Sequence, residues 1–494
     1  MRVLGRVLVR FAGDRSGNVA MIFSLLLVSL AVLAGGAVDL NQAMNARTRL
    51  SQALDAAALA IGVQTSIGQD SATELAGNFL AANYPDREIG TVRNIAVTLD
   101  NENDRVRVQA EAAVDTMFLG LIGIEELTVH WESEVQRARR GLELVMVLDN
   151  TGSMGGSKIA SLREAGLLLT DILFESSDPE RLAIGLVPFS STVNVGTQYA
   201  REWWLDPDGL NPLHSENFVP AANRWDLFDA IDNRAWAGCV EARAIPHDIE
   251  DTLPDPNRPE TLFLPYFAPD ESDRGYYSND YMDDRMGGYD ERARMRNSAK
   301  YAGRDASGAG PNWGCSARPI TPLTNRRATI DDAIEDMIAS GTTNIPIGVS
   351  WGVRVLSPQA PFSEGSAFGD EDVIKAMVIL TDGDNVMTGR SNQNYSDYSG
   401  YGYSRDGRLG LVSSSSTTLA DTLDDRLADA CEYARSLDIR VYTITFQVSS
   451  NSTRNLMRDC ATTPWLYYDS PSEEALRTAF EMIAGDLTNL RLSR

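Results

Sequence analysis

The stretch Leu144-Val145-Met146-Val147-Leu148-Asp149-Asn150-Thr151-Gly152-Ser153 joins an unbroken apolar run to a turn of small, oxygen-bearing side chains. Such a run is typical of a strand covered on both faces, as in a parallel sheet between two layers of helices. The apolar residues that follow the turn are spaced three and four apart, as on the buried face of a helix: Ile159, Leu162, Gly166, Leu169 and Leu173. The sequence therefore predicts an α/β fold, whose ligands bind at the carboxyl ends of the strands.

Asp149, Thr151 and Ser153 alternate along the turn and can offer one carboxylate and two hydroxyls to a common point. An oxygen-only set suits Mg²⁺ or Ca²⁺ and suits zinc or copper poorly. The same residue types are also ordinary in turns and helix N-caps. Two later stretches favour the metal site: residues 378–383 are a second apolar strand ending in an acidic turn, and residues 341–345 begin a helix with a spare hydroxyl.

In this order the three stretches resemble the metal-ion-dependent adhesion site of von Willebrand factor type A domains, whose pattern is Asp-x-Ser-x-Ser, then a Thr, then an Asp. The resemblance implies direct ligation by Thr151, Ser153 and Thr343. It also implies that Asp149 and Asp382 bind the ion through water. Thr151 stands where many members have Ser, and it keeps the hydroxyl.

Composition limits the other classes of function. The 494 residues can hold two or three domains, and the formal net charge of −25 argues against nucleic acid as a partner. The three histidines, His130, His214 and His247, are far apart, which gives zinc catalysis and His-based triads little support. The sequence contains no Gly-rich phosphate loop.

The amino-terminal region combines a basic segment, residues 1–18, with an uncharged run, residues 19–38. Twenty such residues can span a bilayer as a helix. The arginines of the basic segment should stay in the cytoplasm, which sends the rest of the chain outward. A cleavable signal peptide is the alternative, but the apolar run is longer than a usual signal-peptide core. We therefore expect a single-pass membrane protein with the bulk of its chain outside the cytoplasm.

Residues 15–23, Arg-Ser-Gly-Asn-Val-Ala-Met-Ile-Phe, resemble the start of TadE/TadG-type proteins of the Flp (tight-adherence) pilus system. Pseudopilins of that system are cleaved after the Gly and carry a Glu five residues further on. Ile22 holds that place here. We therefore expect the anchor to remain attached, and the resemblance implies that it lies in a bacterial inner membrane with the bulk of the chain periplasmic or outside.

A small α+β stalk is predicted over residues 39–140. Helical periodicity covers residues 40–66, and a second short helix is expected near residues 72–83. Three strands are predicted at residues 95–100, 106–112 and 127–134. The resemblance to the membrane-proximal part of TadG-like proteins extends through residues 118–123, Phe-Leu-Gly-Leu-Ile-Gly.

Residues 141–494 are predicted to form the type A domain, a Rossmann-like, doubly wound sheet with an insertion at about 196–323. Residues 182–189 form a strand before the insertion. The α/β alternation resumes after it with helices from 324, after 343 to 355, at 418–436 and at 473–490, and with strands at 374–381, 439–446 and 467–469.

The insertion is rich in Pro, Gly, Tyr, Asp and Arg and is too long for an ordinary loop. Acidic residues alternate with arginines over residues 270–296. We expect a solvated, self-paired surface there; a second calcium site is the alternative, although no helix-loop-helix calcium spacing is found. A later loop carries Tyr395, Tyr398, Tyr401 and Tyr403, which are either contact residues or ordinary loop composition.

Four cysteines allow three disulfide pairings, and disulfides persist outside the cytoplasm. We predict Cys239 with Cys315, across the insertion, and Cys431 with Cys460, near the end of the chain. Four buried thiols would be expected only if the orientation in the membrane were inverted.

The resemblances together imply a TadG-like pilus-assembly protein that is not an enzyme and that docks an acidic protein partner through a divalent cation. A cell-surface or periplasmic adhesin unrelated to pili is the alternative. A hydrolase that activates water with the metal is a third class, but no general base with suitable reach is visible in the sequence.

Overall fold

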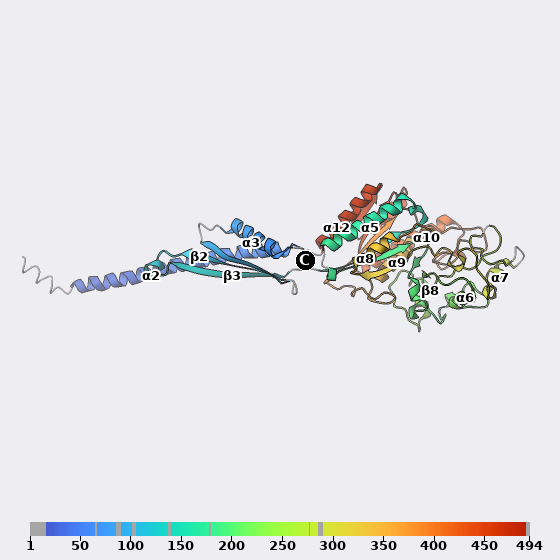
Figure 1. The fold of residues 1–494 in the computed structure, drawn as a ribbon, viewed down its shortest axis with the longest axis horizontal. Coiled ribbons are helices and arrows are strands. Elements are labelled where there is room, and N and C mark those ends of the chain that lie inside the picture. The colour runs from blue at the N-terminus through green and yellow to red at the C-terminus, as the bar shows by residue number, and fades with distance from the viewer. Residues whose placement is uncertain are drawn as a thin grey trace, which may run out of the picture. The chain divides into compact units, whose positions relative to one another are not determined.

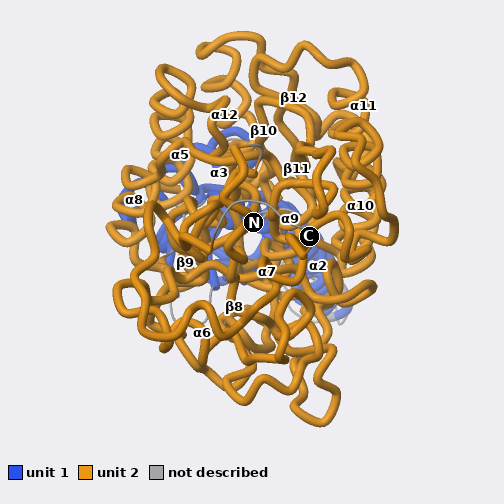
Figure 2. The backbone as a smooth tube through the Cα atoms, turned by 90° about the vertical axis from the view of Figure 1, so that its right-hand side faces the viewer, with its two compact units in different colours: residues 1–139, 494 blue, residues 140–493 orange. Residues whose placement is uncertain are grey.

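The computed structural model describes residues 16–64, 67–84, 90–100, 105–136, 140–176, 179–275, 277–284 and 290–490. They form two compact units that divide between Arg139 and Arg140 (Figure 2). Most of the predicted basic segment, residues 1–15, lies outside the described residues. Each unit is described by itself.

Unit 1 begins with one continuous helix, α2 (Ser16–Gly62). Its first part is the predicted apolar span, and the large side chains of that part are exposed. From Ala43 onward one stripe of the helix is buried in the unit: Ala43, Ala46, Leu50, Leu54, Ala58 and Ile61. Among the described residues, α2 is the one helix long and apolar enough to cross a membrane.

The rest of unit 1 is an antiparallel sheet with strand order β1-β2-β3, covered on one face by α2 and by α3 (Gln69–Asn83) (Figure 1). The strands are β1 (Thr91–Asp100), β2 (Arg105–Asp115) and β3 (Glu126–Gln136). Each predicted strand lies inside one of them. A short 3₁₀ turn, η1 (Leu119–Ile122), lies in the connection between β2 and β3.

Unit 2 is built on a parallel sheet with strand order β12-β11-β10-β4-β5. The strands are β4 (Gly141–Asp149), β5 (Leu182–Phe189), β10 (Val373–Thr381), β11 (Arg440–Phe446) and β12 (Tyr467–Ser470). An antiparallel edge strand, β9 (Thr321–Thr324), pairs with β5. In chain order this is the 3-2-1-4-5-6 arrangement of doubly wound folds, with β4 as the first, central strand.

Two layers of helices cover the sheet (Figure 2). One layer holds α5 (Ser157–Ser176), α8 (Arg327–Glu335) and α12 (Glu473–Leu490). The other holds α9 (Ile345–Val355), α10 (Ser416–Ser436) and α11 (Asn451–Cys460). Val145 and Val147 of β4 face the second layer, while Leu144, Met146 and Leu148 face the first. The continuous apolar run of β4 is therefore explained by burial on both faces.

The predicted insertion extends the sheet. After β5 the chain adds three short antiparallel strands, β6 (Val193–Asn194), β7 (Cys239–Glu241) and β8 (Leu264–Pro265). It also forms two short helices, α6 (Arg224–Ala230) and α7 (Glu291–Met295). Its aromatic side chains join the core of the second helix layer, among them Trp204, Phe218, Trp225, Phe228, Phe263 and Phe267.

The expectation of a solvated acidic surface is wrong at Asp270 and Glu271, which are both buried. The Lys300 ammonium lies 2.6 Å from Asp270 and 3.0 Å from Asp284. Asp270 also accepts the N–H groups of Tyr281 and Met282. The acidic residues are therefore paired, as expected, but Asp270 and Glu271 are buried inside the insertion. Composition does not reveal this burial, because it does not show which residues face each other.

One boundary and one helix also differ from the prediction. A helix was expected from Thr324, but residues 321–324 form β9 and α8 begins at Arg327. Helix α11 was not predicted; its polar sequence hides a single buried stripe of Thr453, Met457 and Cys460. The late tyrosine loop is mostly interior, since Tyr398, Tyr401 and Tyr403 are buried and only Tyr395 is exposed.

The disulfides have the predicted pairing, Cys239–Cys315 and Cys431–Cys460. The first joins β7 to the end of the insertion. The second joins α10 to the last residue of α11, so it fixes two helices of the same layer to each other.

Candidate metal centre

The predicted metal ligands gather at the carboxyl end of β4, the central strand. Asp149 is the last residue of β4, and a 3₁₀ turn, η2 (Gly152–Met154), leads into α5. Met154, the last residue of η2, is buried in the core and so holds the turn against the sheet and α5. Asp382 follows β10, the strand beside β4. Because both strands are parallel and adjacent, their two acidic turns meet at one edge of the sheet.

A continuous chain of hydrogen bonds joins four of the predicted side chains. The Thr151 N–H donates to Asp149 Oδ1 over 2.8 Å, and the Thr151 and Ser153 hydroxyl oxygens lie 3.0 Å apart. The Ser153 hydroxyl in turn donates to Asp382 Oδ1 over 2.5 Å. Asp149, Thr151, Ser153 and Asp382 therefore form one cluster, as the sequence predicted.

The loop before α9 lies against the same turn. The Gly152 N–H donates to the Gly341 carbonyl, and the Ser340 N–H donates to the Asn150 carbonyl. Thr343 is buried, whereas Thr342 is exposed. Among the described residues we find no hydrogen bond from the Thr343 hydroxyl to the rest of the cluster. The structure thus places Thr343 beside the cluster without joining its side chain to it.

Two side chains that the sequence analysis missed also contact the cluster. The Lys158 ammonium, from the first turn of α5, lies 2.6 Å from Asp382 Oδ2. The Thr381 hydroxyl donates to Asp149 Oδ2 over 2.8 Å. Thr381 directly precedes Asp382, so its position next to a predicted ligand could have identified it from the sequence. Lys158 could not be identified from the sequence, because its partner Asp382 is 224 residues away.

The two carboxylates differ in their charge balance. Asp382 has Lys158 as a counter-ion, whereas Asp149, which is fully buried, has no cationic partner among the described residues. Burial and then the nearby negative charge of Asp382 raise the pKa of Asp149 to about 6, although hydrogen bonds from Thr151 and Thr381 act in the opposite direction. The cluster therefore holds more negative charge than its own cation neutralises.

The donor set fits a hard divalent cation. Adjacent ligands of an octahedral ion at ~2.1 Å are roughly 3.0 Å apart, and that is the separation of the Thr151 and Ser153 oxygens. The described residues hold no group of three or more His, Cys, Asp or Glu side chains suited to a metal. Any ion here would therefore depend on hydroxyls and on the two carboxylates.

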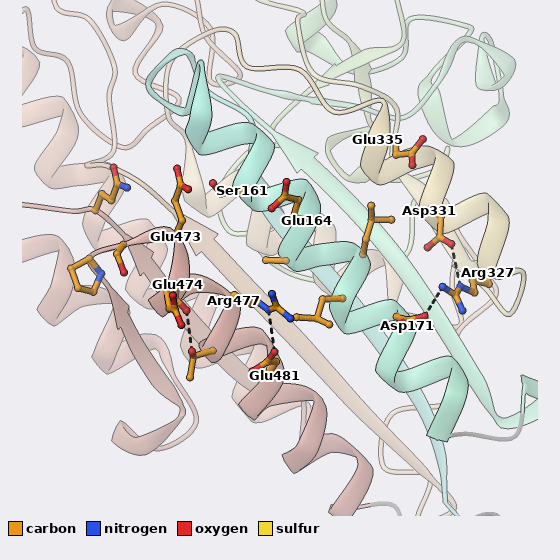
Figure 3. Close-up of a pocket in the computed structure, with 17 residues that line it drawn as sticks. Ser161, Glu164, Asp171, Arg327, Asp331, Glu335, Glu473, Glu474, Arg477 and Glu481 are labelled. Carbon is orange, nitrogen blue, oxygen red and sulfur yellow. Dashed lines mark hydrogen bonds and ion pairs between the residues drawn. The ribbon is translucent and has the colours of Figure 1, made fainter.

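Unit 2 has a cavity beside this cluster and a groove along one of its helix layers. A cavity of about 380 Å³ is bounded by Gly341 and Thr342 of the α9 loop, by Trp313 and the disulfide-bonded Cys315 of the insertion, and by Tyr398. A larger groove of about 1240 Å³ lies between α5, α8 and α12 (Figure 3). Seven acidic side chains line the groove, and its two arginines, Arg327 and Arg477, are already paired with some of them.

The strand order and the hydroxyl-rich turn at the end of the central strand give unit 2 the fold of a von Willebrand factor type A domain. In the chain this unit follows an N-terminal helix of membrane-spanning length. Residues 17–64, within and just beyond α2, match the family described as "Putative Flp pilus-assembly TadE/G-like". That match and the helix are those of a single-pass membrane protein.

A search of curated proteins finds no match. Similar solved structures include the pilus adhesin SpaC from Lactobacillus rhamnosus GG, at 13% identity over 80% of this chain and 34% of that one, with a TM-score of 0.33. Another is the vWF domain of the type V pili tip protein Mfa5 from Porphyromonas gingivalis, at 10% identity over 72% and 97%, with a TM-score of 0.36. A third is proximal thread matrix protein 1 from the mussel byssus, "with zinc occupied MIDAS motif", at 10% identity over 71% and 46%, with a TM-score of 0.29.

Proposed function

We propose that this chain is a membrane-anchored component of Flp pilus assembly whose type A domain docks an acidic protein partner through a divalent cation. The family match over α2 supports the pilus connection. The unbalanced charge at the end of β4 supports the docking chemistry, because the single ammonium at the cluster, that of Lys158, pairs with Asp382 and leaves the charge of Asp149 without a partner among the described residues. That charge imbalance is the observation on which the proposal rests.

The residues of the cluster have separate roles in this proposal. Thr151, Ser153 and Thr343 supply neutral hydroxyl oxygens, and the carboxylates of Asp149 and Asp382 accept hydrogen bonds from those hydroxyls or from water. A cation such as Mg²⁺ or Ca²⁺ bound to neutral hydroxyls keeps most of its charge and attracts an anionic oxygen from a partner. An Asp or Glu side chain is the natural source of that oxygen.

Lys158 gives the cluster an internal counter-ion. Its ammonium forms an ion pair with the carboxylate of Asp382, which the proposal places beside the cation. Like charges at this distance repel, so the ammonium must turn outward when a cation is present. Lys158 is partly exposed and has a flexible stem, so this movement needs no change in the backbone.

The 380 Å³ cavity can hold partner residues that lie next to the Asp or Glu by which the partner binds the cation. It shares Gly341 and Thr342 with the α9 loop, and its far wall belongs to the insertion. The disulfide Cys239–Cys315 fixes that wall to β7. In this proposal the cluster supplies affinity for an acidic side chain, and the insertion selects among the proteins that carry one.

Partner capture from membranes tests the proposal. The full-length chain in detergent should retain its partner in millimolar Mg²⁺ or Ca²⁺ and release it in chelator. Asp149→Ala and Ser153→Ala should abolish the retention. Ser161→Ala is a matched control, because its hydroxyl bonds only within α5. Equal capture by wild type in cation and in chelator would exclude the metal-dependent mechanism.

We further propose that the bulk of the chain lies outside the cytoplasm, anchored in the inner membrane. Two disulfides support this orientation, since such bonds persist in oxidising compartments. A reporter fused after Arg140 should be active outside the cytoplasm. Cytoplasmic activity at that position would overturn the orientation.

Two other functions give different results. An adhesin unrelated to pili would use the same cluster, and its gene would lie apart from pilus-assembly genes. We propose no enzymatic activity, and assay of the protein against ester and phosphoester substrates tests this directly. Metal-dependent turnover lost in Asp149→Ala would make the protein a hydrolase.

A further inference from the structure

The connection between β2 and β3 in unit 1 carries a group of exposed apolar side chains. We call residues 116–124 the interface loop; none of the nine is charged. Met117, Leu121 and Ile122 are 71%, 74% and 57% exposed, and Ile124 is exposed as well. Large apolar side chains gathered in this way mark a contact with another molecule or with a membrane.

The interface loop is fixed to α2 by one buried carboxylate. Asp39 Oδ1 accepts the N–H of Met117 over 3.0 Å, and Oδ2 accepts those of Phe118 and Leu119 over 2.9 and 2.8 Å. Two glycines just before Asp39 let the loop approach closely. A Cβ at Gly35 would overlap the ring of Phe118, so no other residue fits there without moving that ring.

This contact lies where the apolar span ends. Residues 19–38 are uncharged, and as a helix they extend about 30 Å, the thickness of a hydrocarbon core. Gly35 belongs to the last turn of that run, so Phe118 packs beside the span itself. Figure 1 shows α2 projecting beyond the three-stranded sheet of unit 1. When residues 19–38 span a bilayer, the exposed side chains of the loop lie at the level where hydrocarbon meets lipid headgroups.

The backbone of the loop is suited to such an environment. At least seven of its nine N–H groups donate either to Asp39 or to carbonyls of the loop and of Glu125, namely those of residues 116–119, 121, 123 and 124. Unsatisfied N–H groups are costly in lipid. Because these backbone N–H groups are already satisfied, the surface that the loop exposes is formed mainly by its apolar side chains.

We propose that the interface loop inserts Met117, Leu121 and Ile122 into the surface of the bilayer that α2 spans. Lipid is the occupant, since the apolar surface of the loop continues that of the span at the same depth and carries no charge. Asp39 is the positioning residue that sets the depth of the loop. Unit 1 then has two contacts with the membrane, and this holds whether or not unit 2 binds a metal.

A fluorescent label in the loop tests the proposal. All four native cysteines are disulfide-bonded, so Leu121→Cys provides a single thiol for the polarity-sensitive dye NBD. The matched control is Leu59→Cys, which is also exposed on unit 1 but lies about 30 Å further along α2 from Asp39. Full-length protein is reconstituted in phosphatidylcholine–phosphatidylglycerol vesicles, with and without lipids that carry a doxyl quencher near the headgroup.

We expect the emission at position 121 to shift to the blue and to lose most of its intensity with doxyl lipid, while the emission at position 59 does neither. Asp39→Asn should reduce the quenching at position 121, because it weakens the three hydrogen bonds that dock the loop. Asp55→Asn should not, because Asp55 bonds Ser133 elsewhere on the same helix. Equal, unquenched spectra at 121 and 59 would overturn the proposal. A blue shift without quenching, which grows with protein density, would also overturn it and would show a second copy of the chain on the loop.

Discussion

Asp149 and Glu241 are both fully buried carboxylates of unit 2, yet their environments act on them in opposite directions. Burial and the neighbouring Asp382 raise the pKa of Asp149 to about 6. Burial alone would also raise the pKa of Glu241, but the guanidinium groups of Arg224 and Arg408 outweigh it and hold that pKa below its ordinary value. Tyr398 adds a hydrogen bond to Glu241.

The contrast separates a structural network from a candidate binding site. Glu241, in β7, forms ion pairs with two buried arginines, Arg224 of the insertion and Arg408 of the loop after β10, so its negative charge is fully neutralised. At the end of β4, the partly exposed ammonium of Lys158 pairs with Asp382, and Asp149 has no cationic partner among the described residues. A surplus of negative charge that is held rigidly and not neutralised is what a cation requires. Burial alone therefore does not identify a functional carboxylate, but an unbalanced set of partners does.

Breaking the ion-pair network of Glu241 should have the largest effect on stability. Glu241→Ala leaves two buried arginines without their anion, which costs about 3 to 5 kcal/mol in the free energy of unfolding. Asp229→Ala removes the exposed Arg201–Asp229 pair and should cost less than about 1 kcal/mol. Urea unfolding of the full-length protein in detergent measures both. Equal costs would mean that Glu241 is not a structural centre of the insertion.

The unbalanced cluster should instead respond to cations. At a cation concentration 100 times the dissociation constant, unit 2 should gain about 2.7 kcal/mol of stability by mass action. Ser153→Ala should remove this gain and leave stability in chelator nearly unchanged. Differential scanning calorimetry with Mg²⁺, with Ca²⁺ and with chelator checks the prediction. An identical transition of the wild type in all three would contradict it.

A third buried carboxyl, that of Glu216, should make the stability of unit 2 depend on pH. Glu216 lies near Arg408, but its Oε2 is buried without a hydrogen bond among the described residues. Burial, partly offset by Arg408, raises its pKa from 4.5 to about 7. The folded state therefore favours the protonated acid, and this contribution is present below pH 4.5 and is lost as pH rises through 7.

Wild type should accordingly lose about 1 to 3 kcal/mol more stability than Glu216→Gln between pH 4.5 and 7.5. Glutamine keeps the size of the side chain and does not titrate. Unfolding curves of the two proteins at matched ionic strength give the difference at each pH. Parallel pH profiles would show that Glu216 has an ordinary pKa.

The smallest expected effect concerns Lys158. Lys158→Met removes the cation that competes for Asp382 and should tighten Mg²⁺ or Ca²⁺ binding by about 1 kcal/mol, roughly fivefold. Arg477→Met is the control, because it removes an exposed pair with Glu481 in the acid-lined groove. Isothermal titration calorimetry compares the two. Weaker cation binding in Lys158→Met would mean that the lysine helps to hold the cation and does not compete with it for Asp382.

Local sequence pattern determined much of this architecture. The apolar run of β4, the glycines after it and the spacing on α5 defined the strand, turn and helix, because these depend on residues close together in the chain. The same holds for α2, whose unbroken apolar run defines the span. The candidate ligands Asp149, Thr151 and Ser153 belong to one turn, so their proximity follows from the sequence itself.

Only the tertiary structure decided which distant side chains meet. Lys158 contacts Asp382 across 224 residues, Arg408 contacts Glu241 across 167, and Asp39 holds the interface loop from 78 to 80 residues away. The sequence alone suggested a solvated surface where Asp270 and Lys300 are buried together. Periodicity reports which face of an element is apolar. The partner of a charged side chain depends on how separate elements pack, and no short-range pattern carries that information.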